Sequence, residues 1–143
     1  MTRILAMGCS NSSTSINRQF SQHIASQIEE AEVQLLDLQD LQLPLYGVDL
    51  EKESGIPKNA HRFNQFIEAN DAIVLSLAEH NGMPSAAFKN LWDWTSRIDK
   101  KFWGEKPIFL ASTSPGGRGG ANALKIVKGV LPIFGGKVLE EFS

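Results

Sequence analysis

The chain has 143 residues, of which 42% are hydrophobic and 21% charged, and its formal net charge is −2 at pH 7. This is the composition of an ordinary globular domain, and the weak, interspersed charge argues against a nucleic-acid-binding surface. No apolar run is long enough to cross a bilayer, and the single cysteine, Cys9, excludes an internal disulfide and a cysteine-cluster metal site. Since no secretory pattern precedes the first predicted strand, we expect a cytoplasmic protein with one domain over residues 1–143.

Strands and helices are predicted to alternate along the chain. An apolar run forms the first strand, and Phe20, Ile24 and Ile28 then recur at the spacing of one helix face. The third strand is almost wholly apolar, as expected of a central strand in a parallel sheet. In chain order we predict strand 3–9, helix 16–31, strand 33–38, a loop over 41–55, helix 57–70, strand 71–77, helix 84–98, strand 107–112, a glycine-rich loop over 113–120, helix 121–131 and strand 137–142.

This alternation predicts an α/β fold in three layers, with a five-stranded parallel sheet between helices. Ligands of such sheets bind beyond the carboxyl ends of the strands, where the strand order reverses. Polar loops that contain glycine follow the first, third and fourth predicted strands. In the flavodoxin-like order 2-1-3-4-5 these strands are neighbours, so the three loops would lie together at one edge of the sheet.

The loop at residues 8–17 carries the strongest signal, because hydroxyl and amide side chains crowd the start of the first helix. A helix N-terminus has unpaired N–H groups and a partial positive charge, so it can hold a phosphate without lysine or arginine. A polar turn with an ordinary N-cap explains the same residues, and both interpretations stay open. The P-loop and G-x-G-x-x-G motifs are missing here, which argues against an ATPase and a Rossmann domain. The candidate ligands in this loop are Ser10, Ser12, Ser15, Ile16 and Asn17.

Several motifs along the chain resemble those of one family. They are Ser-Ile-Asn-Arg at 15–18, Leu-Pro-Leu-Tyr at 43–46, Glu-His-Asn-Gly at 79–82, Phe-Lys-Asn-Leu-Trp-Asp-Trp-Thr-Ser-Arg at 88–97, and Lys-Pro at 106–107 followed by residues 112–120. The chain resembles the NADPH-dependent FMN reductase family, flavodoxin-like flavoproteins that include quinone, chromate and azo reductases. The resemblance covers nearly the whole chain, and the Glu-x-Asn-Gly and Lys-Asn-x-x-Asp-Trp motifs at this spacing are its specific part.

The resemblance implies an enzyme that binds FMN and takes hydride from NADPH or NADH. Electrons would pass through the flavin to a small-molecule acceptor: a quinone, an azo compound, a metal oxyanion or free flavin. It implies no catalytic side chain and no metal, because the cofactor carries the chemistry. His80 would flank the flavin ring, although a plain surface histidine remains an alternative. The other candidate flavin ligands are Ala78, Glu79, His80, Asn81, Gly82, Ser112, Ser114, Gly116 and Gly117.

The family also implies a homodimer or homotetramer. Trp92 and Trp94 lie on one short predicted helix and cannot share a face, so we expect one of them near an interface. Three departures from the family pattern stand out. His80 replaces the usual tyrosine, Asn11 and Ser12 occupy a stretch that often holds an arginine, and the sequence stops at the fifth strand where the family adds a helix. A missing helix would leave one sheet face partly bare near the first and fifth strands.

A second interpretation is a flavodoxin-like electron carrier, or a flavin-binding module without its own NAD(P)H reaction. Such carriers tend to be strongly acidic and to bury the flavin between aromatic walls. This chain is nearly neutral, and only Tyr46 and His80 are expected near the ring. The enzyme is therefore the favoured prediction.

Overall fold

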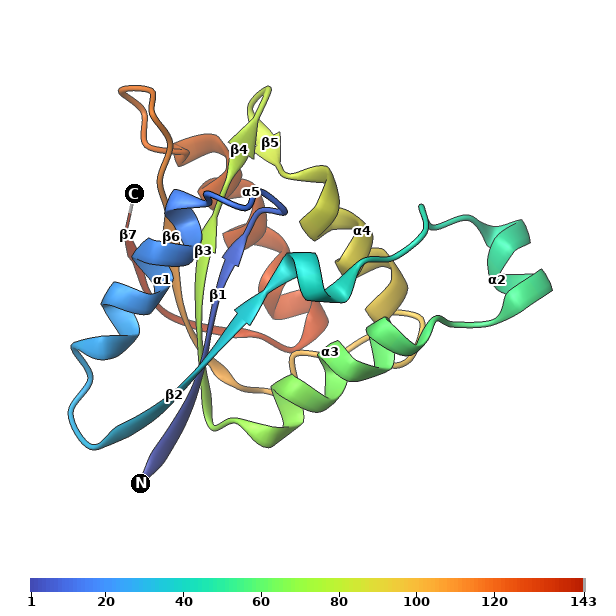
Figure 1. Cartoon of the computed structure of the whole chain (residues 1–143), viewed down its shortest axis with the longest axis horizontal. Helices are drawn as coiled ribbons and strands as arrows, with labels where there is room; N and C mark the ends of the chain where they lie inside the picture. Colours follow the sequence, from blue (N-terminus) through green and yellow to red (C-terminus); the bar gives the residue numbers. More distant parts are fainter. Residues whose placement is uncertain (143) are drawn as a thin grey trace.

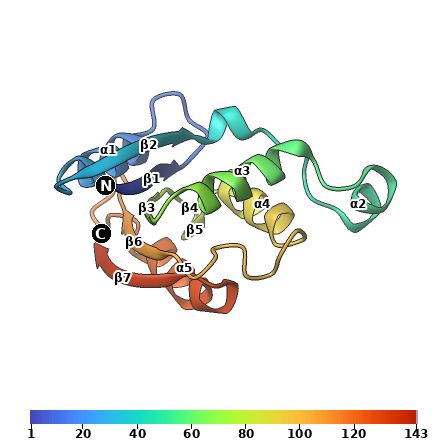
Figure 2. The ribbon, with the colours of Figure 1, turned by 90° about the horizontal axis from the view of Figure 1, so that it is seen from below.

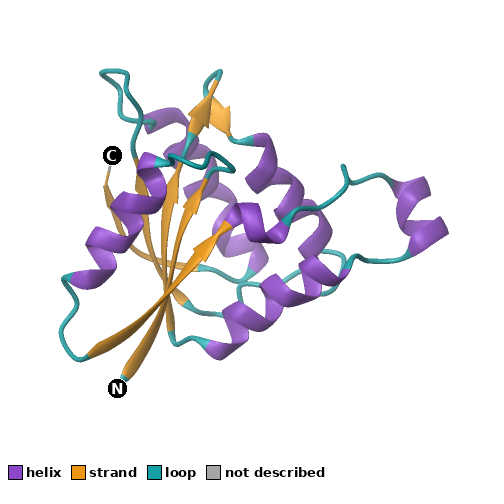
Figure 3. Ribbon diagram, viewed as in Figure 1, coloured by secondary structure: helices purple, strands orange, loops and turns teal. Residues whose placement is uncertain are grey.

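The computed structural model describes residues 1–142 and contains a five-stranded parallel sheet, drawn in Figures 1 and 3. The strand order is β2-β1-β3-β6-β7, which is the flavodoxin-like order predicted from the sequence. All four neighbouring strand pairs in this sheet are parallel: β2–β1, β1–β3, β3–β6 and β6–β7. The strands are β1 (Thr2–Cys9), β2 (Ala31–Asp37), β3 (Ala72–Leu77), β6 (Pro107–Ser112) and β7 (Lys137–Phe142).

Helices cover the two faces of the sheet unequally. Because side chains alternate along a strand, Leu5 and Met7 face the larger core and Ile4 and Ala6 face the smaller one. The larger core is closed by α3 (Lys58–Ala69), α4 (Ala86–Thr95), α5 (Ala121–Val130) and the short η2 (Leu131–Phe134); the smaller core is closed by α1 (Ile16–Ser26). The three predicted layers are confirmed.

The sheet face beside α1 is partly exposed at β7, as predicted for the fifth strand, whereas the predicted bare region near β1 is wrong, since β1 is buried from Ile4 to Cys9. The ring of Phe142 on β7 lies 6.1 Å, centroid to centroid, from that of Phe20 on α1, and the Phe142 side chain stays 58% exposed. A single helix therefore leaves part of this face in contact with solvent.

Two predicted boundaries are wrong. The first helix ends at Ser26, not near residue 31, because the chain turns at Glu30, whose φ of 53° is left-handed, and β2 begins at once. The predicted loop over 41–55 contains a helix, α2 (Val48–Ser54), after the short η1 (Leu38–Leu41). No residue of α2 is buried, so it has no apolar stripe to reveal it in the sequence. It projects from the body of the molecule (Figure 2).

A small hairpin, which the sequence prediction missed, follows β3. It pairs β4 (Glu79–His80) with antiparallel β5 (Met83–Pro84). Both turn residues have positive φ, 56° at Asn81 and 77° at Gly82, as in the tight primed turns for which Asn-Gly is favoured. The turn brings the chain back to Ser85, whose Oγ accepts from the N–H of Phe88 and caps α4.

Trp92 and Trp94 are both buried within the chain. Trp92 packs edge-on against the rings of Phe88 and Phe134, and Trp94 packs edge-on against Tyr46. Both rings therefore pack inside the fold, and the prediction that this helix segment lies near a subunit interface stays a prediction. The two positions do face different directions, but a loop covers the second one.

Candidate functional site

The three polar loops lie together at the carboxyl edge of the sheet, as predicted (Figure 1). β1, β3 and β6 are adjacent, so the loop 10–15, the β4–β5 hairpin and the loop 113–120 follow neighbouring strand ends. Since the strand order reverses beside β1, this edge is where a doubly wound sheet binds its ligand.

The first loop presents hydrogen-bond donors at the start of α1. Ser15 is the N-cap, and its Oγ accepts from the N–H of Arg18 at 3.1 Å. Ser10 Oγ accepts from the N–H of Ser12, also at 3.1 Å, so each of these two hydroxyls keeps its own proton for a ligand. Within residues 1–142 no protein atom accepts from the backbone N–H groups of Ile16 and Asn17. The loop therefore offers hydroxyls, free N–H groups and the positive end of a helix dipole.

Gly8 sets the distance between this helix and the sheet, a role that sequence reasoning missed. A Cβ at Gly8 would collide with the backbone N and Cα of Arg18. The start of α1 can therefore pack directly on the end of β1 only because residue 8 has no side chain. A glycine near the end of an apolar strand was the available signal.

Asn17 uses its side chain inside the protein. Its Oδ1 accepts from Ser76 Oγ at 2.7 Å and from the Thr113 N–H at 3.2 Å, and its Nδ2 donates to the Thr113 carbonyl at 3.2 Å. The prediction grouped Asn17 with the phosphate ligands. In the structure its amide is committed to β3 and the loop after β6, while its backbone N–H has no acceptor within residues 1–142.

Glu79 is likewise turned into the protein. Its Oε1 accepts from the N–H of Ala123, in the first turn of α5, at 2.7 Å. The helix cap itself, Gly120, has no side chain, so Glu79 supplies the missing acceptor from another element. Ala78 is buried, whereas His80 and Asn81 at the hairpin tip are exposed.

The loop after β6 is closed by its own hydrogen bonds. Buried Ser112 donates from Oγ to the carbonyl of Gly119 at 2.8 Å, and Ser114 Oγ accepts from the N–H of Gly116 at 3.3 Å. A Cβ at Gly120, where φ is 80°, would come within 3.0 Å of Ser112 Cβ. Gly116 and Gly117 are exposed at the tip, and the four predicted residues of this loop thus divide into a fixed base and an open tip.

A cavity of about 470 Å³ adjoins the first loop. Asn11 lines one side, Leu43 and Leu45 from the loop after β2 line another, and Ala86 and Asn90 of α4 close it. These residues were not among the predicted ligands, although the Leu-Pro-Leu-Tyr motif pointed to their loop. The cavity places an apolar wall beside the donor-rich loop.

The apolar wall formed by Leu43 and Leu45 belongs to the loop after β2, and this loop is fixed to α4. The carbonyl of Pro44 accepts from Trp94 Nε1 at 2.7 Å and from Asn90 Nδ2 at 3.0 Å, and the Tyr46 hydroxyl donates to Glu51 Oε1 at 2.9 Å. That hydrogen bond to a carboxylate raises the pKa of Tyr46 above 10.0. The loop that carries Leu43 and Leu45 is therefore held in place before any ligand binds.

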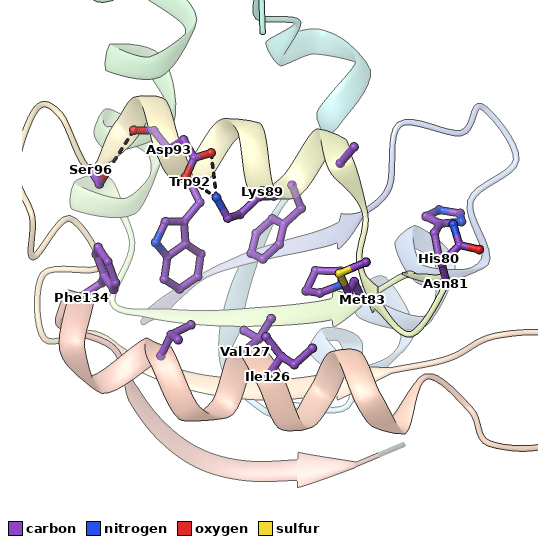
Figure 4. A pocket seen from close by; sticks show the side chains of 14 residues that line it. His80, Asn81, Met83, Lys89, Trp92, Asp93, Ser96, Ile126, Val127 and Phe134 are labelled. Atoms are coloured by element: carbon purple, nitrogen blue, oxygen red, sulfur yellow. Dashed lines mark hydrogen bonds and ion pairs between the residues drawn. The ribbon is translucent and has the colours of Figure 1, made fainter. Parts of the chain in front are cut away.

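A second cavity, an apolar groove of about 590 Å³, runs between α4 and α5 (Figure 4). Phe88, Trp92 and Val127 line it, and His80 and Asn81 lie at the end nearest the hairpin. We call it the α4–α5 groove. It shares those two hairpin residues with the candidate site.

The side chains of the site contain no obvious catalyst. Burial raises the pKa of the Cys9 thiol well above its ordinary value, which opposes formation of a nucleophilic thiolate. Residues 1–142 hold no cluster of three or more His, Cys, Asp or Glu side chains suited to a metal ion. In the same part of the chain, no helix has the length and apolar character needed to span a bilayer.

The strand order and the donor-rich loop at the end of β1 define a flavodoxin-like protein of the mononucleotide-binding class. The family model of the NADPH-dependent FMN reductases matches residues 2–143. The chain therefore belongs to the NADPH-dependent FMN reductase family.

Known proteins resemble the chain to different extents. A quinone reductase of Escherichia coli K12 is 27% identical over 99 residues, which are 69% of this chain and 53% of that protein. A quinone reductase of Pseudomonas putida is 37% identical over 87 residues, 60% of this chain and 46% of that protein. The chain thus spans about half the length of the curated relatives it matches. The structure of FerB, a flavoenzyme NAD(P)H:(acceptor) oxidoreductase from Paracoccus denitrificans, is 28% identical with a TM-score of 0.80, over 97% of this chain and 75% of that one.

Proposed function

We propose that this protein is an FMN-dependent NAD(P)H oxidoreductase that passes electrons to a small-molecule acceptor. The observation that carries the proposal is the set of free donors at the start of α1, next to a cavity with an apolar wall. A phosphate needs the hydrogen-bond donors, and a flat aromatic ring needs the apolar wall. Quinones are the acceptors best supported by the names of the relatives, and azo compounds, metal oxyanions and free flavin are further candidates.

The residues present fit FMN. In this proposal Ser10, Ser12 and Ser15 donate hydroxyl hydrogen bonds to the phosphate, and the N–H groups of Ile16 and Asn17 complete its shell. When bound, FMN supplies hydride acceptance from NAD(P)H and the onward transfer of electrons. The protein positions the reactants and excludes water, which is consistent with the lack of a catalytic side chain.

Flavin titration of the variant Ser15→Asp tests the phosphate placement. Aspartate caps helices as well as serine does, so α1 should form, but its charge would repel the phosphate. We expect FMN affinity to fall at least about tenfold, as close like charges predict, while riboflavin binding is unchanged. Ser26→Asp adds the same charge at the far end of α1 and should not affect FMN affinity. Unaltered FMN affinity in folded Ser15→Asp would refute the placement.

The competing function is that of an electron carrier or flavin-binding module. The net charge of −2 is far from the strongly acidic composition typical of such carriers, which favours the enzyme. Anaerobic addition of NADPH, and separately NADH, to the FMN-loaded protein decides between the two. Rapid bleaching of the flavin absorbance is expected for the enzyme; a carrier would keep its flavin oxidised.

We also infer that the protein forms a homodimer through the α4–α5 groove. Met83 and Ile126 on its rim are 57% and 44% exposed, and a small ligand on the groove floor would leave both in water. Lys89 and Asp93, one turn apart on α4, form an ion pair at 2.7 Å, and on an antiparallel second copy each charge of this pair would face the opposite charge of its counterpart. Light scattering of Ile126→Glu should give the mass of one subunit, while Val48→Glu on α2 should leave the dimer intact. A wild-type protein with the mass of one subunit would contradict the dimer.

A further inference from the structure

The buried amide of Asn17 joins three elements of the fold. It is 3% exposed and sits at the second position of α1, with hydrogen bonds to Ser76 on β3 and to both backbone groups of Thr113, the first residue after β6. Thus one planar group links the helix under the first loop, the strand that leads to the hairpin, and the base of the loop 113–120.

The chemistry of this junction requires an amide. The Thr113 N–H is shared between the Leu77 carbonyl at 3.3 Å and Asn17 Oδ1 at 3.2 Å, and the Thr113 carbonyl accepts from Asn17 Nδ2. Asparagine offers the acceptor and the donor on adjacent atoms of one plane. Aspartate has the same shape but would set a carboxylate oxygen against the Thr113 carbonyl. Alanine would leave the Ser76 hydroxyl without this acceptor in the buried interior.

We infer that Asn17 is a positioning residue that fixes the loop 113–120 relative to the start of α1, and so presets the spacing between the phosphate end and the ring end of the site. This inference rests on the proposed flavin site and goes beyond it, because it removes the Asn17 side chain from the phosphate ligands. The second anchor of the same loop, from Ser112 Oγ to the Gly119 carbonyl, ties the loop to the end of β6 and makes no contact with α1.

Two flavins separate positioning from direct phosphate binding. If Asn17 positions the loop, Asn17→Ala should weaken both FMN and riboflavin by about tenfold, the effect of losing one partner of a buried hydrogen-bond group. A side chain that only binds phosphate would affect FMN and spare riboflavin, as expected for Ser15→Asp. Asn17→Asp should weaken riboflavin as much as Asn17→Ala does, although riboflavin has no phosphate to repel.

A matched control is available at Asn70. This asparagine is also buried, at 2% exposure, and its Nδ2 donates to Gln34 Oε1 and to the carbonyl of Phe66, where α3 ends and the chain enters β3. Asn70→Ala should lower the stability of the fold by a similar amount without changing either flavin affinity. If it weakens both flavins as Asn17→Ala does, the effect is general destabilisation and the inference fails.

A partner variant tests the contact itself. Ser76→Ala removes one hydrogen bond of the junction and should weaken flavin binding. The double variant Asn17→Ala/Ser76→Ala should bind flavin no more weakly than Asn17→Ala alone, because both substitutions remove the same contact. Additive losses would show that the two side chains act separately, and would overturn the inference.

A measurement on the flavin-free protein keeps this inference independent of the proposed function. Arg118 is the trypsin site in the loop 113–120 and is exposed. Cleavage after Arg118 should be several-fold faster in Asn17→Ala than in the wild type or Asn70→Ala, because the loop base loses its link to α1. Equal cleavage rates would refute the positioning role. Failure of the wild type to bind FMN, with faster cleavage retained, would refute only the flavin site.

Discussion

The two ends of the candidate site are built in opposite ways. At the start of α1, the hydroxyls of Ser10 and Ser15 bond only to backbone a few residues away and keep their protons for a ligand. At the ends of β3 and β6, the side chains of Glu79 and Ser112 turn inward and bond to other backbone segments. The first end therefore presents side chains to a ligand, and the second presents mainly backbone and the exposed hairpin tip.

This difference changes what a substitution can do. In the proposed flavin site, a side-chain replacement at the phosphate end should act directly on the ligand, whereas one at the ring end should act by moving a loop. Gly8 lies beneath the first of these ends, where the start of α1 touches β1.

The largest effect is expected for Gly8→Ala. A methyl group there meets backbone atoms of residues 17 and 18, which cannot move away as a flexible side chain could. We expect a loss of about 3 kcal/mol or more in the free energy of unfolding, since overpacking against backbone exceeds the usual range. Denaturant unfolding of the flavin-free protein measures it.

Gly47→Ala is the control for this change. A Cβ at Gly47 would meet no atom within 4 Å beyond its immediate chain neighbours, and the φ of −155° there is open to any residue. The stability of this variant should stay close to that of the wild type. If Gly8→Ala were equally harmless, direct packing of α1 on β1 would not be what sets the phosphate end in place.

Much of this architecture could be predicted from the sequence. The strands 107–112 and 137–142 have the predicted bounds, because apolar residues flanked by polar turns are a local signal. The meeting of three loops at one edge also followed, since it depends only on strand order. Family membership added the cofactor, which no local pattern could name.

The rest depends on contacts between distant residues. α2 has no buried face, so its sequence carries no helical periodicity, and it is held through Glu51, which pairs with Arg97. The inward orientation of Asn17 and Glu79 arises from partners 96 and 44 residues away. A polar residue in a binding motif can bind the ligand or support the loop, and only the fold separates the two roles.

The next largest effect concerns His80, the exposed side chain at the hairpin tip. Phenylalanine keeps a ring beside the flavin and removes the hydrogen bonds of the imidazole. If the ring end acts mainly through backbone, His80→Phe should retain FMN and change the rate of its reduction by NADPH by about tenfold, or 1.4 kcal/mol in the barrier. Anaerobic stopped-flow bleaching measures this step. A loss of several thousandfold with FMN fully bound would make His80 a catalytic residue.

A smaller effect is expected at Glu79. Glu79→Ala removes the acceptor for the Ala123 N–H and should cost about 1 kcal/mol of stability, the usual value of a helix cap. Flavin affinity should fall with it, because the hairpin loses its tie to α5. Glu79→Gln keeps an acceptor oxygen and should therefore retain most of the stability and most of the flavin affinity. Loss of flavin affinity in Glu79→Gln equal to that in Glu79→Ala would mean that the charge itself faces the ligand.

The smallest effect concerns the apolar wall, which is tied to α4 partly through Tyr46. Tyr46 is the only tyrosine, so the ultraviolet absorbance of its ionised phenolate reports its pKa without ambiguity. The hydrogen bond to Glu51 raises the pKa of Tyr46, so the folded midpoint should lie above 10.0 and return to about that value in denaturant. Because the unfolded chain then loses its proton first, this contribution to stability is complete below pH 10 and is lost as the pH rises through the folded pKa.

Glu51→Gln should lower the folded midpoint, while Glu53→Gln on the same helix should leave it in place. An unchanged midpoint in Glu51→Gln would mean that the Tyr46–Glu51 bond does not persist in solution, and that the wall after β2 is held to α4 by the Pro44 carbonyl and the Tyr46 N–H.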